Sequence, residues 1–120
     1  MKIKHFLILA IFLLNTVYAS KAEIKNVTVS KSSNNLYTFN VTILHNDTGW
    51  NHYINKWTIV DSNDNIIATR ILHHPHVNEQ PFTRSKSNVL IDGTSKEYFI
   101  KVYENTKKNS IEKYPIFLKK

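Results

Sequence analysis

One short segment gathers side chains that can bind a metal ion or move a proton. It reads His-His-Pro-His-Val-Asn-Glu-Gln-Pro-Phe-Thr-Arg-Ser and begins at His73. Neutral imidazole is the commonest side-chain ligand for zinc and copper(II), and a carboxylate can supply an oxygen ligand. A β-sheet core does not need polar groups at this density, so the segment is the first candidate for a functional site.

The histidines of this segment predict a metal site with ligands from two parts of the chain. Residues two apart point the same way in an extended chain, so His74 and His76 can face one ion. Pro75 between them restricts the backbone. His52, in an earlier polar connection, is the expected third ligand. We therefore predict a divalent metal site formed by His52, His74 and His76.

Reserve ligands and the type of metal follow from the rest of the sequence. His45, His73 and Glu79 are further donors in or beside the same connections. The sequence has no cysteine, and its single methionine is Met1. The lack of soft sulfur ligands argues against copper(I) and favours copper(II) or zinc. The alternative is that these histidines cap strands and bind loop backbone without holding a metal.

A carboxylate and a guanidinium lie in the same segment. Glu79 and Arg84 can form a bidentate ion pair, because the guanidinium fork matches the two carboxylate oxygens. We expect this pair to fix the connection to the sheet. Recognition of a substrate by the same two groups is the alternative.

Aromatic residues accompany both polar connections. Trp50, Tyr53 and Phe82 can line a shallow surface for a sugar or a peptide. They can equally close the open end of a hydrophobic core. The sequence leaves both interpretations open.

Two motifs that mark large enzyme classes do not occur in this sequence. It has no Gly-x-Ser-x-Gly nucleophile elbow. Its two glycines, Gly49 and Gly93, cannot form a phosphate-binding glycine-rich loop. We therefore predict a binding protein rather than an enzyme.

The sequence around these residues predicts β-strands. Seven segments alternate apolar and polar residues with the period of two that is typical of strands: residues 23–30, 36–45, 53–61, 66–72, 82–91, 96–104 and 111–118. We expect an irregularity in the first strand near Lys25 and Asn26. Pro115 confines the last strand to the edge of a sheet, because proline cannot donate to a ladder.

Seven short strands in about 100 residues predict an antiparallel β-sandwich of the immunoglobulin or fibronectin type III kind. Trp57, in the third strand, fits the core tryptophan of such domains, although no cysteine pair accompanies it. A small barrel is the alternative fold. We expect residues 20–120 to form one domain. Two polar connections, residues 46–52 and 73–81, separate strands, and the sequence leaves open whether they meet in space.

The first 19 residues have the pattern of a secretory signal peptide. Lys2 and Lys4 precede an apolar run at residues 6–14, and Ala19 supplies a small residue before the expected cleavage point. The apolar run is too short to span a bilayer as a helix, which takes about 20 residues. We therefore expect residues 20–120 to be exported to the periplasm or the medium, with no integral membrane segment after cleavage.

The charge of the chain bears on its partners. The formal net charge is +7, and it falls to +5 when Lys2 and Lys4 are removed with the signal peptide. The basic residues are scattered rather than gathered in a stripe with exposed aromatics, so we do not expect nucleic acid as a partner. The class that competes with a metal-binding module is a structural or protein-interaction domain, in which an exposed edge strand pairs with an unknown partner protein.

Two blocks of the sequence resemble a known family. They are Asp-Thr-Gly-Trp-Asn-His-Tyr, from Asp47, and His-Pro-His-Val-Asn-Glu-Gln-Pro-Phe-Thr-Arg-Ser, from His74. They resemble an uncharacterised family of small exported bacterial proteins with a signal peptide and one β-rich domain. The resemblance spans residues 41–102 and implies export and a β-rich fold. This chain departs from the family pattern after its penultimate strand, where it lacks the usual Arg-Asp-Ser-Val-His-Gly run.

Overall fold

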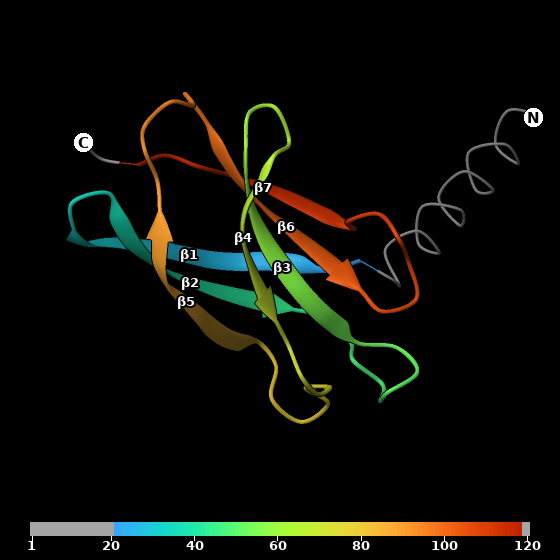
Figure 1. Ribbon diagram of the computed structural model, residues 1–120. Coiled ribbons are helices and arrows are strands. Elements are labelled where there is room, and N and C mark those ends of the chain that lie inside the picture. The colour runs from blue at the N-terminus through green and yellow to red at the C-terminus, as the bar shows by residue number, and fades with distance from the viewer. Residues whose placement is uncertain (1–20, 119–120) are drawn as a thin grey trace, which may run out of the picture.

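The computed structural model describes residues 21–118, which form seven β-strands (Figure 1). The predicted signal peptide at residues 1–19 lies outside the described residues. The strands are β1 (Glu23–Ser33), β2 (Leu36–Leu44), β3 (Ile54–Asp61), β4 (Ile66–Ile71), β5 (Phe82–Leu90), β6 (Tyr98–Glu104) and β7 (Glu112–Ile116). Each of the seven predicted strands is present, and the bounds differ by at most a few residues. Over residues 21–118, the structure contains no helix with the length and apolar character needed to cross a membrane.

The strands form two antiparallel sheets rather than a closed barrel. One sheet has the order β1-β2-β5, and the other has the order β4-β3-β6-β7. This arrangement is consistent with a β-sandwich, so the all-β, two-sheet part of the fold prediction is confirmed. Strand β7, which carries Pro115, lies at an edge as predicted. The register of β1 against β2 shifts between Ile24 and Asn26, where the irregularity was expected.

The core between the sheets follows from the alternation of side chains along the strands. In β2 the inward side chains are Phe39, Val41 and Ile43, and all three are buried. Trp57 of β3 is fully buried as well, as predicted. Burial of side chains of this size contributes roughly 1.5–3 kcal/mol each to folding. The large aromatic and aliphatic residues of the central strands therefore hold the two sheets together.

The connections that follow β2, β4 and β6 lie at the same end of the molecule (Figure 1). Hydrogen bonds join them in pairs. The His76 amide donates to Asp47 Oδ2 over 2.8 Å, and the Tyr53 amide donates to Asn105 Oδ1 over 2.9 Å. The two polar connections therefore meet in space, and the start of the β6–β7 connection meets them.

Candidate metal centre

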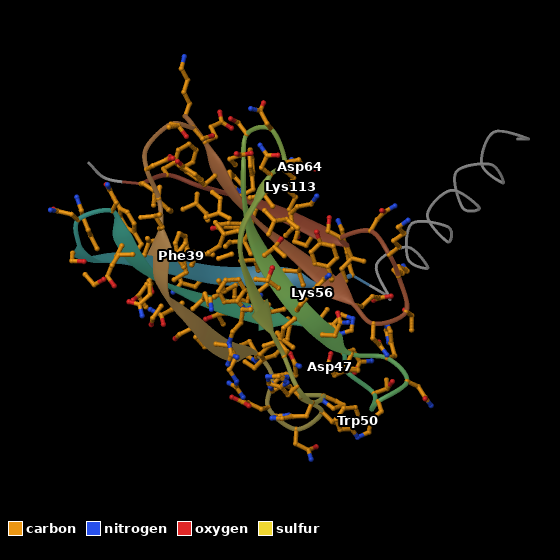
Figure 2. The ribbon with its side chains drawn as sticks, in the orientation of Figure 1. Phe39, Asp47, Trp50, Lys56, Asp64 and Lys113 are labelled. Carbon is orange, nitrogen blue, oxygen red and sulfur yellow. The ribbon has the colours of Figure 1, made fainter. Side chains whose placement is uncertain are left out.

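Two histidines and one glutamate come together at this end of the sandwich. His45 directly follows β2, His52 lies in the β2–β3 connection, and Glu104 is the last residue of β6. The ligand atoms of the three side chains all lie within 4.8 Å of one another. Figure 2 shows Asp47 and Trp50, from the same connection as His52, at this end of the molecule. In the following text, the metal cluster means His45, His52 and Glu104.

A tight turn brings His52 back toward β2. The Thr48 amide donates to the His52 carbonyl over 3.0 Å, and the His52 amide donates to the Gly49 carbonyl over 3.1 Å. Gly49 has a φ of 148°, a backbone conformation that residues with a side chain rarely adopt. The turn places the His52 ring edge-on to the His45 ring, with 5.0 Å between their centroids.

One oxygen of Glu104 faces both imidazoles. His52 Nε2 lies 3.0 Å from Glu104 Oε2, and His45 Nε2 lies 3.5 Å from the same oxygen. The His45 contact lacks hydrogen-bond geometry, so His45 Nε2 is buried without a hydrogen-bond partner among the described residues. The His45 and Glu104 side chains are almost fully buried, whereas the His52 side chain is 30% exposed. His52 therefore forms the solvent-facing side of the cluster.

Asp47 orients the His45 ring. Its Oδ1 lies 2.6 Å from His45 Nδ1 and also accepts the Ile54 amide over 3.1 Å. An ionised carboxylate only accepts hydrogen bonds, so His45 Nδ1 must carry the hydrogen. In the neutral ring, the lone pair then lies on Nε2, which faces Glu104. A carboxylate behind a metal-binding histidine commonly fixes the tautomer and the ring in this way.

Both buried carboxyl groups favour the ionised form. Burial opposes ionisation of Glu104, but hydrogen bonds from Thr106 and His52 outweigh it and hold the Glu104 pKa below its ordinary value. Burial likewise opposes ionisation of Asp47. Hydrogen bonds from His45 and from the His76 and Ile54 amides outweigh it, and the Asp47 pKa is lowered too. Metal binding would require the hydrogen of the His52 ring to lie on Nδ1 rather than on Nε2, which here faces Glu104. The cluster then offers two imidazole nitrogens and a carboxylate oxygen, a ligand set known from zinc sites with an open position.

The predicted ligand trio differs from this cluster. His52 belongs to both sets, and the reserve residue His45 takes a central place. His74 and His76 have ring centroids 4.8 Å apart. However, they are not in the group of three ligands that the described residues bring within metal-binding range. The period-two argument does not apply to them, because the chain between β4 and β5 is not an extended strand.

His76 instead packs into the molecule. Its ring stacks on Phe82, with 4.1 Å between centroids and 7° between planes. Burial lowers the pKa of His76, and the positive charge of Arg84 lowers it further. His76 Nδ1 lies 3.9 Å from Asp47 Oδ2, but neither ring nitrogen has a hydrogen-bond partner among the described residues. His76 is therefore a buried packing residue behind the cluster, and its neighbours His73 and His74 are exposed.

Glu79 and Arg84 form a bidentate contact. Arg84 Nη1 donates to Glu79 Oε2 over 3.2 Å, and Arg84 Nη2 donates to Glu79 Oε1 over 2.9 Å. The Arg84 guanidinium lowers the Glu79 pKa. The contact joins the β4–β5 connection to β5, the arrangement expected for a pair that fixes the connection to the sheet.

The three aromatic residues beside the polar connections differ in their exposure. Trp50 is 65% exposed and packs edge-on against Tyr53, with 5.6 Å between centroids. Phe82 is fully buried, so it takes no part in an exposed aromatic surface. It is the first residue of β5, and its side chain faces the core beneath His76.

Sequence reasoning missed Glu104 and Asp47. The alternation of side chains along β6 contained the signal for Glu104. Its side chain points to the same face of the strand as Tyr98, Ile100 and Val102, which all face the core. A carboxylate at an inward position requires a partner, because an unpaired buried charge is costly. No comparable periodic signal marks Asp47, which lies in a connection.

Comparisons with protein-family models, curated proteins and solved structures give no match to this chain.

Proposed function

We propose that this protein is a small non-enzymatic binding module that holds one divalent metal ion, zinc or copper(II), at His45, His52 and Glu104. The observation that carries the proposal is the state of His45 Nε2. This buried nitrogen has no hydrogen-bond partner among the described residues, and it faces an ionised carboxylate oxygen 3.5 Å away. An unpaired buried polar atom costs about 1–3 kcal/mol, and a cation between the two atoms would satisfy both.

The spacing of the cluster suits such an ion. Ligands at about 2.0–2.2 Å in tetrahedral geometry lie roughly 3.4 Å apart. Small side-chain shifts from the present spacing, within 4.8 Å, reach that value. The sequence offers no sulfur ligand apart from Met1, which favours zinc or copper(II) over copper(I).

The decisive experiment loads tag-free protein with zinc or copper(II), removes excess ion by dialysis, and measures stoichiometry and affinity. We expect one equivalent, held with a Kd below about 1 μM. His52→Ala, at a partly exposed position, and the nearly isosteric Glu104→Gln should each weaken binding about tenfold or more.

The double variant His73→Ala/His74→Ala is the matched control. It removes two exposed imidazoles from the neighbouring connection and should keep the wild-type affinity. Loss of the ion in this control, with retention in His52→Ala, would contradict the proposed ligands. Binding well below one equivalent in the wild-type protein would contradict the proposed function.

We also propose export to the periplasm or the medium, and an immunoglobulin or fibronectin type III kind of sandwich. The signal-like residues 1–19 support the first proposal. The division into a 1-2-5 sheet and a 4-3-6-7 sheet supports the second, because chain crossings between two sheets are typical of such Greek-key sandwiches.

The competing function is a structural or protein-interaction domain. The observation in its favour is the edge strand β4, where Ile66 is 62% exposed and Ile71 is 47% exposed. An exposed apolar edge can pair with a strand of another protein. Partner binding that is lost in Ile71→Lys but kept in His52→Ala would favour this function.

A further inference from the structure

We infer that the metal centre binds an oxyanion, a carboxylate or a phosphate group, between its ion and the ammonium group of Lys107. This inference rests on the proposed metal-binding function. It assigns a class of ligand to the open coordination position of the metal. The residue that carries it is Lys107, which belongs to no sequence motif.

The turn after β6 folds Lys107 back over the cluster. The Lys107 amide donates to the Glu104 carbonyl over 3.3 Å, and Lys107 Nζ lies 3.8 Å from Glu104 Oε1. Thr106 donates to the same oxygen over 2.7 Å. Glu104 Oε1 thus faces Thr106 and Lys107, whereas Oε2 faces the two imidazoles. A metal ion bound to Oε2 and the Lys107 ammonium group near Oε1 would therefore be neighbours on the same Glu104 carboxylate.

The side of the cluster where Lys107 and His52 lie is accessible to solvent. The Lys107 side chain is 53% exposed, and the partly exposed His52 lies on the same carboxylate. His45 and Asp47 close the opposite, buried side. A ligand from solvent therefore reaches the ion past His52 and Lys107.

The local charge favours an anion. A divalent ion would cancel the negative charges of the Glu104 carboxylate and of the Asp47 carboxylate behind His45. The ammonium group of Lys107 would then leave the site with a net positive charge. Three protein ligands leave a fourth position for water or an exogenous group. Carboxylates and phosphates carry at least two oxygens on one carbon or phosphorus atom. One oxygen can bind the metal ion while another accepts a hydrogen bond from the Lys107 ammonium group.

The test uses tag-free full-length protein loaded with cobalt(II), whose visible absorption reports its coordination and which binds the same nitrogen and oxygen ligands. Acetate and inorganic phosphate are titrated separately, at an ionic strength held constant with perchlorate. We expect a saturable spectral change with at least one of them, and the more tightly bound anion identifies the source. Lys107→Ala should weaken that binding about fivefold, a modest loss because an exposed charge is screened.

Lys108→Ala is the control, because it removes an equal charge from the next residue in the chain. It should bind anion as the wild type does. Cobalt retained with no anion response, or equal anion affinity in Lys107→Ala and the wild type, would overturn the oxyanion site and leave the metal centre standing. Failure to retain one equivalent of cobalt would overturn the metal centre itself, and the oxyanion site with it.

Discussion

At the scale of single residues, Asp47 links more of the candidate site than any metal ligand does. One carboxylate oxygen contacts His45 and accepts the Ile54 amide, and the other accepts the His76 amide. The same side chain therefore selects the His45 tautomer and holds the β4–β5 connection against the β2–β3 connection. Its role in metal binding would be exerted through His45, as a positioning residue.

Replacing Asp47 by Asn should weaken metal binding about 10-fold to 100-fold, as is typical when the carboxylate behind a ligating histidine is lost. Asn keeps an acceptor for His45 but removes the negative charge that makes the imidazole a better ligand. Affinity measured by competition with a chromophoric chelator checks this, and urea unfolding of the metal-free protein measures the structural cost separately. Asp92→Asn, in an exposed turn, is the control. Unchanged metal affinity in Asp47→Asn would rule out the positioning role.

At the scale of elements, the β4–β5 connection makes two kinds of contact with its surroundings, one through a neutral side chain and one through an ion pair. Gln80 accepts the buried His45 amide over 2.9 Å and donates to the His76 carbonyl over 2.8 Å. The ion pair of Glu79 and Arg84 lies closer to the surface. Solvent screens such a pair, whereas an amide left unpaired in the interior has no substitute partner.

We therefore expect Gln80→Ala to lower the free energy of unfolding by about 1–3 kcal/mol, because it leaves buried backbone groups unpaired. Glu79→Gln should change stability little. Urea denaturation of both variants and the wild type, monitored by tryptophan fluorescence, makes the comparison. A larger loss in Glu79→Gln than in Gln80→Ala would show that the ion pair holds the connection.

At the scale of the whole molecule, the metal cluster joins chain segments that lie far apart in sequence. His52 and Glu104 come from the β2–β3 connection and the end of β6, in the four-stranded sheet, while His45 follows β2 of the other sheet. An ion held by all three would link the two sheets at one end. Such an ion binds the folded state and not the unfolded chain, so it must stabilise the fold.

Zinc at about 100 times its Kd should add roughly 2.7 kcal/mol to the free energy of unfolding. For a domain of this size, that raises the Tm by about 10 °C or more. Differential scanning calorimetry with and without zinc measures the shift, and chelation should reverse it. Glu104→Gln should show a much smaller shift, and an equal shift in that variant would place the stabilising ion elsewhere.

The strands and much of the core could be predicted from local sequence patterns. Alternation is a local property of an extended chain, so Phe39, Val41 and Ile43 could be placed on one buried face, and Trp57 in the core. Composition also identified imidazole and carboxylate as the groups able to bind a metal, and it placed His45 and His52 near the relevant connections.

Which of these groups come into contact depends on long-range packing. His45 and Glu104 are far apart in sequence, and no periodicity relates them. Their contact depends on how β2 and β6 pack at one end of two different sheets. In the structure the His76 ring stacks on Phe82, whereas the His74 side chain is exposed. The two side chains differ because an irregular connection does not keep the alternation of a strand. Residue type and local spacing thus indicated the chemistry, whereas the choice of ligands depended on long-range packing.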